Sequence, residues 1–279
     1  SRVTDMSNVF ESKTTFNANL TNWDTSKVTS MFRTFYQAYV FNGDVSGWDT
    51  SSVTTLYQTF FRTTRFNGNI SGWDTSRVMT LESTFFLATS FTGDGVFNWD
   101  TSRVATLLNT FHGATSFTGD GVLNWDTSSV TSMNGAFQGA TSFTGDGVSN
   151  WDTSRLTKLG DTFRDATSFT GDGVSNWNTS SVTTLSNTFY GATSFTGHGV
   201  SSWDTSRVIN LVRTFKDATS FNTDLSIWNV TKLDVAIDKT KDAFENTKSL
   251  KPCYKRFIFD SWTSQGVKID VSWKTWEHL

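Results

Sequence analysis

The chain contains few of the residues that would support several common kinds of protein. Among its 279 residues there is one cysteine, Cys253, and one proline, Pro252. A single cysteine excludes a disulfide within the chain, so we expect Cys253 to be a buried apolar side chain or the partner of a cysteine outside this segment. The three histidines, His112, His198 and His278, lie far apart in the sequence. Because no nucleophile, base and orienting group come together in any motif, we predict that the chain is not an enzyme.

Long apolar runs and a surplus of positive charge are also missing. Hydrophobic residues make up 36% of the chain, and no stretch approaches the roughly 20 apolar residues of a membrane-spanning helix. We therefore predict no membrane span in this segment. The formal net charge is −3, and there is no basic patch that could follow a phosphate backbone. This excludes nucleic acid from the expected partners.

Aromatic residues, by contrast, are abundant and regularly spaced, with 25 Phe and 12 Trp. Residues 98–122, NWDTSRVATLLNTFHGATSFTGDGV, represent a unit that returns every 25 or 26 residues. Self-similarity at a fixed period of this size is typical of a solenoid, whose units bury their apolar faces only against their neighbours. The tryptophans of successive units are Trp23, Trp48, Trp73, Trp99, Trp125, Trp151, Trp177, Trp203 and Trp228. The first phenylalanines are Phe10, Phe35, Phe60, Phe85, Phe111, Phe137, Phe163, Phe189, Phe215 and Phe244.

Each unit combines two local patterns. The apolar positions Val78, Leu81, Phe85 and Ala88 follow steps of three and four residues, which predicts a short helix or 3₁₀ turns. A glycine-rich corner and a short strand over residues 96–99 are expected next. Stacked strands would form a parallel sheet with about 4.8 Å between neighbours, so ten coils would make a rod about 50 Å long.

The two ends of the repeat differ from its centre. Residues 1–6 align with residues 26–31, so the chain opens within a repeat, and we expect a fragment or processed product of a longer precursor. We predict a solenoid of about ten coils over residues 1–247, with the first coil incomplete, and a C-terminal cap over residues 248–279. Within the cap, residues 251–262 should form a helix with Pro252 in its first turn. The alternating Val267, Ile269 and Val271 predict a final strand.

The repeated motif resembles one known family. The sequence FNGDVSGWDTSSVT of residues 41–54, iterated about ten times over residues 1–247, is similar to the BspA-like leucine-rich-repeat surface protein family. Two departures are the Thr that replaces the usual Met before Phe35, Phe60 and Phe85, and the added Gly of the Gly-Asp-Gly corner. The resemblance implies a right-handed, leucine-rich-repeat-like solenoid, located outside the cell or on its surface, that serves adhesion or surface structure without enzyme activity.

Two rows of aspartates recur along the repeat, and two interpretations stay open for them. Stacked carboxylates could hold calcium, which would be the one cofactor of the chain. Alternatively, each Asp caps a turn through its side-chain oxygen. Asn178 and Asn229 replace the first Asp and His198 the second, which favours caps, because Asn keeps the hydrogen bond and His is a poor calcium ligand. The calcium candidates are Asp94, Asp100, Asp120, Asp126, Asp146 and Asp152.

Other repeated side chains suggest surface activities that compete with structural roles. Stacked threonines such as Thr75, Thr101 and Thr127 could order ice or mineral, but a hydroxyl ladder to neighbouring backbone is favoured. One tryptophan per unit could form a track for carbohydrate, although a buried column is favoured. Four Asn-x-Ser/Thr sequons, at Asn19, Asn69, Asn178 and Asn229, predict N-glycosylation.

These features predict an extracellular structural or adhesive repeat protein that displays an extended surface. It would assemble with itself or with other repeat chains, end to end or side by side, into a fibre or coat. The alternative is a soluble module that binds proteins or glycans, and an ice- or mineral-binding surface is a third candidate. The position occupied by Lys27, Ser52 and Arg77 alternates between cation and Ser, and such an undistinguished face favours assembly over one selective ligand.

Overall fold

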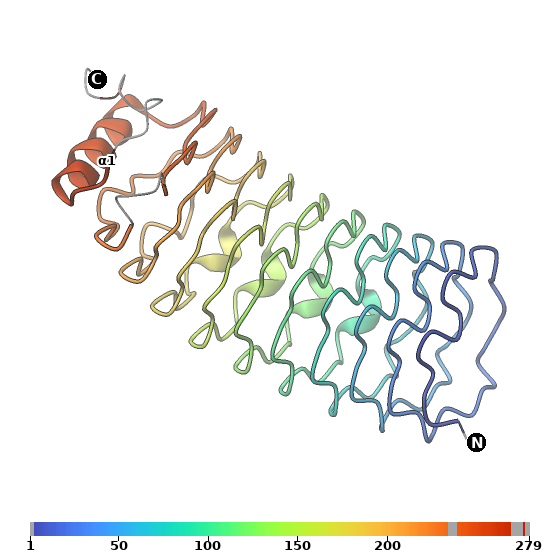
Figure 1. Cartoon of the computed structure of the whole chain (residues 1–279). Coiled ribbons are helices and arrows are strands. Elements are labelled where there is room, and N and C mark those ends of the chain that lie inside the picture. The colour runs from blue at the N-terminus through green and yellow to red at the C-terminus, as the bar shows by residue number, and fades with distance from the viewer. Residues whose placement is uncertain (1–2, 234–238, 269–275, 277–279) are drawn as a thin grey trace.

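The computed structural model describes residues 3–233, 239–268 and 276. The chain forms a single stack of coils with its two termini at opposite ends (Figure 1). Four 3₁₀ helices occupy successive corners: η1 (Asp94–Val96), η2 (Asp120–Val122), η3 (Asp146–Val148) and η4 (Asp172–Val174). One α-helix, α1 (Pro252–Ser264), follows the last described coil. The predicted repeat solenoid is therefore confirmed.

A column of phenylalanines runs through the core from one end to the other. The rings of ten units lie nearly parallel, with centroids of neighbouring rings 5.2–5.8 Å apart. Phe35 and its equivalents up to Phe189 are fully buried. Each ring except the first and the last thus has a nearly parallel ring of the same type in the coil on either side, and its closest stacking partner is the second phenylalanine of its own coil, as in Phe85 and Phe91 at 3.9 Å.

The segment between Val78 and Ala88 and its equivalents contains no helix among the described residues, so the helical alternative was wrong, and the turns that it does contain include left-handed residues such as Ser83, which a 3₁₀ turn does not. Instead, successive backbone N–H groups donate alternately to the next coil and to a carbonyl three residues back in the same coil. Arg33 and Phe35 donate to the carbonyls of Tyr57 and Thr59 in the next coil, at 3.0 and 2.8 Å, whereas Tyr36 donates to the Arg33 carbonyl three residues back, at 3.1 Å. The segment is therefore a chain of turns in which every second N–H group binds the neighbouring coil. We call the surface formed by this segment, residues 31–38 in the second coil and their equivalents in the other coils, the ladder face.

The predicted parallel strands are replaced by this ladder. Six isolated parallel bridges occur, such as Ser30 with Thr55, and the described residues contain no longer strand. Residues 96–99, expected to be extended, form a turn in which Trp99 donates to the Val96 carbonyl at 3.2 Å. Two residues of each ladder segment have left-handed backbone, for example Arg33 (φ 52°) and Gln37 (φ 58°), and these interrupt any continuous strand. Ile269 and Val271 of the predicted final strand lie outside the described residues.

The coils are closest together on the ladder face. Ring centroids of Tyr36, Phe61, Phe86 and His112, which lie on that face, are 4.3–4.6 Å apart. The separation grows to 5.2–5.8 Å in the central phenylalanine column. It reaches 6.1–6.5 Å between the tryptophans on the opposite side. Because the separation increases steadily across the section, the solenoid curves with the ladder face on its inner side.

Buried polar groups tie each coil to the next. Trp125 Nε1 donates to the Val96 carbonyl at 3.0 Å, and the same bond recurs from Trp48 to Trp228. These tryptophans are 1–4% exposed, so a buried column is confirmed and they offer no track for carbohydrate. The Thr101 hydroxyl donates to the Asp126 carbonyl at 2.9 Å and is also buried. This confirms a hydroxyl ladder for the row that contains Thr75, Thr101 and Thr127.

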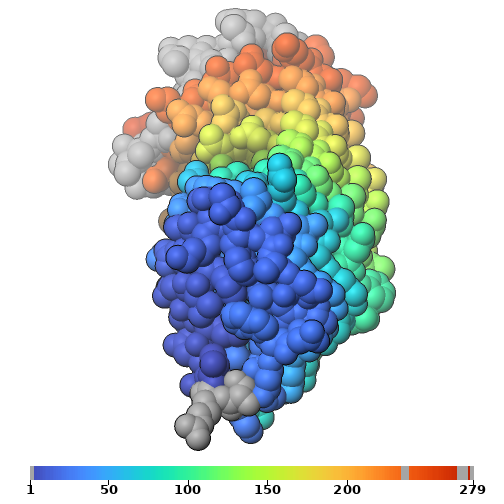
Figure 2. Space-filling model, turned by 90° about the vertical axis from the view of Figure 1, so that its right-hand side faces the viewer, coloured from blue at the N-terminus to red at the C-terminus, as the bar shows by residue number. Residues whose placement is uncertain are grey.

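The two ends of the stack are finished differently. Helix α1 contains Pro252 in its first turn, as predicted, and covers the last coil with Trp262. The Trp262 ring stacks 6.2 Å from Trp228, and its Nε1 donates to the Leu225 carbonyl at 3.0 Å, so it repeats the bond of the preceding tryptophans. At the opposite end Trp23 is 44% exposed, and Figure 2 shows this first coil facing the viewer.

A second buried threonine row leads to a stability prediction. Thr162 donates its hydroxyl to the Met133 carbonyl in the preceding coil at 2.9 Å, and six equivalent threonines do the same. Ala136 occupies this position in the sixth coil. We expect Ala136→Thr to stabilise the fold by about 1 kcal/mol, because its hydroxyl would bind the Leu107 carbonyl. Thermal unfolding measures this, with Thr162→Ala as the reverse control, and a lower midpoint for Ala136→Thr would contradict the ladder.

The corners give a second prediction, because they leave no space for a side chain. A Cβ atom on Gly147 would overlap the carbonyl oxygen of Gly119 in the preceding coil. We expect Gly147→Ala to destabilise the solenoid by about 1–3 kcal/mol, since backbone would have to move. Gly72→Ala is the matched control, because its nearest neighbour is the Ser46 carbonyl oxygen at 3.8 Å. Equal unfolding midpoints for the two variants would show that the corners are not close packed.

Candidate functional site

The glycine-rich corners of the coils carry rows of exposed polar side chains. These corners exist in two forms. In the shorter coils, Asn19, Asp44, Asn69 and Asp224 accept the backbone N–H two residues ahead, at 2.8–3.0 Å. In the longer coils a glycine precedes the aspartate and takes a left-handed conformation, as in Gly93 (φ 99°). The added residue is absorbed by a 3₁₀ turn, and the aspartate instead accepts the hydroxyl of the Thr two residues before it.

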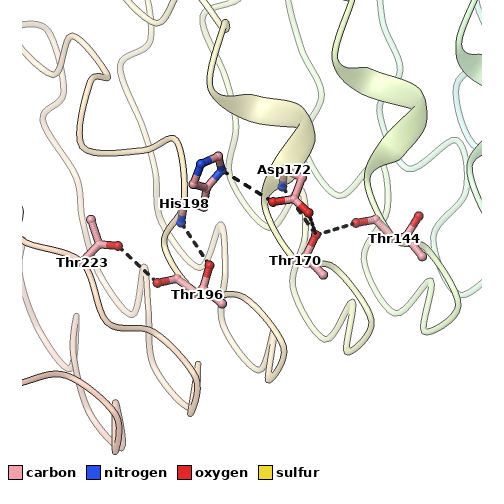
Figure 3. Close-up of polar contacts among 6 residues, drawn as sticks. All are labelled: Thr144, Thr170, Asp172, Thr196, His198 and Thr223. Carbon is pink, nitrogen blue, oxygen red and sulfur yellow. Dashed lines mark hydrogen bonds and ion pairs between the residues drawn. The ribbon is translucent and has the colours of Figure 1, made fainter.

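Figure 3 shows the corner at which His198 stands in place of the aspartate of the longer coils. Thr170 donates its hydroxyl to Asp172 Oδ2 at 3.1 Å, and His198 replaces the aspartate in the next coil. The His198 Nδ1 atom lies 3.6 Å from Asp172 Oδ1, and both side chains are about two-thirds exposed, at 65% and 67%. Thr196 accepts the His198 backbone N–H at 3.3 Å. A contact this exposed contributes little to stability, so the row is a surface feature and not a buried site.

The structure places the six calcium candidates in separate hydrogen bonds. Asp100, Asp126 and Asp152 accept the backbone N–H of the Ser two residues ahead, at 2.8–2.9 Å. The corner aspartates accept threonine hydroxyls at 3.1–3.3 Å, and these are Asp94, Asp120 and Asp146. In the part of the chain that the structure describes, no group of three or more His, Cys, Asp or Glu side chains is arranged to hold a metal. The aspartates after the tryptophans thus cap turns, whereas the three corner aspartates accept side-chain hydroxyls and cap no backbone N–H.

Turn capping changes the acidity of the row after the tryptophans. The Ser102 hydroxyl, followed by its backbone N–H, lowers the pKa of Asp100 below the ordinary value of 3.8. The same two groups of the following serine lower the pKa of Asp49, Asp74, Asp152 and Asp204. Hydrogen bonds to the charged form are the cause, since they are lost on protonation.

The four predicted sequons are turns of this same kind. Asn19, Asn69, Asn178 and Asn229 are exposed, and each side-chain oxygen accepts the backbone N–H two residues ahead, at 2.8–3.2 Å. An Asn-x-Ser/Thr sequence therefore arises wherever Asn takes the place of Asp in the turn. The turns account for the spacing of the sequons, and glycosylation stays a prediction.

The histidines and Cys253, which the sequence offered as chemically distinctive side chains, do not lie together. His112 lies on the ladder face, where burial, and then the charge of Arg164, lower its pKa. His198 lies at a corner, and His278 is outside the described residues. Cys253 is exposed, so the expected burial was wrong: α1 turns Ile258 and Trp262 toward the solenoid, and Cys253 lies on another side.

Sequence reasoning missed the ladder face, where the side chains differ most from coil to coil. Around each core phenylalanine, four outward positions vary, as in Phe32, Arg33, Tyr36 and Gln37. The equivalent residues of the seventh coil are Gly160, Asp161, Arg164 and Asp165. The signal was available in the sequence as four variable positions within an otherwise repeated unit.

The lowered acidity of the turn aspartates gives a pH prediction. A folded-state pKa below the unfolded value adds stability above about pH 4, and this stability is lost as the pH falls through the folded value. We expect the unfolding midpoint to drop between about pH 4 and pH 2. The triple variant Asp100→Asn, Asp152→Asn and Asp204→Asn keeps the turns, as Asn178 does, and should flatten that drop. Identical pH profiles for the variant and the parent chain would contradict this origin.

Comparisons with known proteins identify the repeat. A family model described as "Mycoplasma protein of unknown function, DUF285" matches the chain three times in succession, over residues 1–97, 80–173 and 171–268. A comparison with curated proteins gives no match. None of the helices in the described residues has the length and apolar character needed to cross a bilayer. Since the three matches together extend over most of its length, the chain belongs to the DUF285 family.

Proposed function

We propose that the chain is an extracellular structural or adhesive repeat protein that displays an extended surface and assembles with copies of itself. The continuous ring columns support this, because a core that is uniform from coil to coil makes a stiff rod. The exposed turn rows support it too, since they repeat one polar pattern along that rod. Neither feature forms a site for chemistry. The extracellular location and the right-handed leucine-rich-repeat kinship belong to this proposal and rest on the BspA-like motif.

The observation that carries the assembly proposal is the first coil. Trp23 is 44% exposed there, whereas Trp48, one coil further, is 3% exposed. Phe10 and Phe16 stack at 4.3 Å beside it, and Val9 is 40% exposed. Within the repeat, an apolar coil end of this kind is the surface on which a further coil stacks, whether that coil belongs to the same chain or to another copy. We propose contact through the first coil or through the sides of the stack, which are the end-to-end and side-by-side contacts that the sequence suggested.

A soluble binding module is the second candidate function. The observation that favours it is the ladder face, whose side chains vary from coil to coil while the turn rows repeat. A uniform surface suits assembly, and a varied surface suits recognition of a partner.

Light scattering of the whole protein tests the assembly proposal. We expect an oligomer that falls to a monomer in Trp23→Lys, because a charge would replace the exposed ring. Phe257→Lys is the matched control, since Phe257 is 50% exposed on α1, and it should remain oligomeric. The measurement is repeated in calcium and after chelation. Insensitivity to chelation is expected if the aspartates act as caps, dissociation on chelation would mean that they hold metal, and a monomeric parent chain would rule out self-assembly.

A further inference from the structure

The ladder face of the second and third coils carries an unusual cluster of aromatic and arginine side chains. We call it the aromatic–arginine patch, and its members are Phe32, Arg33, Tyr36, Tyr57, Phe61 and Arg62. All are partly exposed, and Arg62 is the most open. The patch lies on the inner side of the curve, where neighbouring coils are closest.

The rings of the patch cover one another's faces. Tyr36 and Phe61 stack at 4.6 Å with 10° between their planes, and Phe32 and Tyr57 stack at 5.4 Å with 6°. The Arg33 guanidinium lies over the outermost rings, 5.1 Å from the Phe32 centroid and 4.7 Å from that of Tyr36. Phe61 packs against Phe86 of the fourth coil at 4.5 Å, so the rings of the Tyr36 and Phe61 column present mainly their edges to solvent. Ring edges carry partial positive charge, so this surface attracts oxygen acceptors.

The two arginines of the patch are not neutralised by carboxylates. The Arg33 Nε atom donates to the Gln58 Oε1 atom at 2.6 Å, and neither Arg33 nor Arg62 forms an ion pair with the described residues. Glu82 occupies the Tyr57 position in the fourth coil, where burial raises the pKa of its carboxyl. The patch thus holds two arginines that form no ion pair with the described residues, and Glu11 and Glu82 occupy ladder positions in the two flanking coils.

The far half of the same face shows the contrast. Arg213 lies 3.3 Å from Asp242, and Lys216 lies 2.6 Å from Glu245. Arg164 lies 3.4 Å from Asp161 and 3.4 Å from Asp165. The fold can thus place carboxylates beside cations at these positions, and in the second and third coils it does not. The unpaired charge is a property of the patch and not of the ladder face in general.

Backbone conformation also separates the patch from the middle of the face. Arg33 (φ 52°), Gln58 (φ 55°) and Arg62 (φ 56°) occupy left-handed positions, which suit glycine. The equivalent positions in the fifth and sixth coils hold Gly113 and Gly139 among others. The same positions hold Leu87 in the fourth coil and Arg213 in the ninth, so long side chains in this conformation are not confined to the patch.

We propose that the aromatic–arginine patch binds an acidic, extended polypeptide segment, whose Asp or Glu carboxylates lie against Arg33, Arg62 and the ring edges. The proposal deepens the binding role of the proposed function by naming its face and its partner. Polysaccharides and nucleic acid strands bind aromatic side chains through open ring faces, and here the faces are covered. The backbone donors of the ladder are bound to neighbouring coils, so recognition would depend on side chains.

Binding of fluorescein-labelled poly-L-glutamate, followed by fluorescence anisotropy in low salt, tests this inference. We expect the parent chain to bind and the double variant Arg33→Glu, Arg62→Glu to lose about tenfold or more in affinity, since attraction becomes repulsion. The control is Arg77→Glu with Arg103→Glu, which makes the same charge change at exposed arginines of another row. It should keep the affinity of the parent. Arg62→Glu alone serves if the double variant does not fold, because Arg62 is exposed.

Three outcomes would overturn the proposal. They are no binding by the parent chain, equal losses in the patch and control variants, and tighter binding of a polyuronate than of poly-L-glutamate with the same dependence on Arg33 and Arg62. Light scattering of the same variants separates this inference from self-assembly. If the patch variants stay oligomeric while the affinity is unchanged, the patch proposal fails and the assembly proposal stands.

Discussion

The structure depends on one constraint: every core phenylalanine must have a ring of the same kind above and below it. Phe85, for example, stacks on Phe60 at 5.7 Å and on Phe111 at 5.6 Å. A ring of this size buries roughly 150–250 Å², and in a single coil most of that area would meet water. No coil can therefore be stable alone, and each is held by its two neighbours. The tryptophan and threonine bonds extend the same dependence to the backbone, because their acceptors belong to the preceding or following coil.

Ring stacking explains why the coils could be counted from the sequence while their backbone could not. The spacing of Val78, Leu81 and Phe85 depends only on which side chains point inward. A helix meets that spacing, and so does a chain of turns with a left-handed residue every fourth position. The decisive signal was the recurrence of Gly, Asn and Asp at two positions, as in Asn109, Gly135 and Asn187, which are left-handed in the structure. In the second coil the same two positions hold Arg33 and Gln37, so the recurrence of Gly, Asn and Asp is not visible there.

The polar rows were foreseeable for a different reason. Asp, Asn, Ser and Thr bind backbone two residues away, so a repeated Asp-Thr-Ser sequence predicts capped turns without knowledge of the fold. The corner was harder, because one added glycine changes which partner the aspartate takes. Asp44 accepts the Ser46 N–H, whereas Asp94 accepts the Thr92 hydroxyl. The inner curvature was not accessible from the sequence, since it arises from unequal ring separations on two sides of the stack, 4.6 Å between Tyr36 and Phe61 and 6.1 Å between Trp48 and Trp73.

The turn rows and the ladder face divide the surface by what their side chains must do. An aspartate that caps a turn is fixed by the backbone it binds, and so it repeats in every coil, with Asn as its neutral substitute. Such a row is free to support adhesion or assembly, but it cannot distinguish one partner from another along its length. The outward side chains of the ladder face are not fixed in this way. Backbone N–H and C=O groups form the ladder, and the alternate, inward side chains form the core. Selective recognition in this solenoid is therefore expected at the ladder face, where Arg33 and Arg62 lie without carboxylate partners among the described residues.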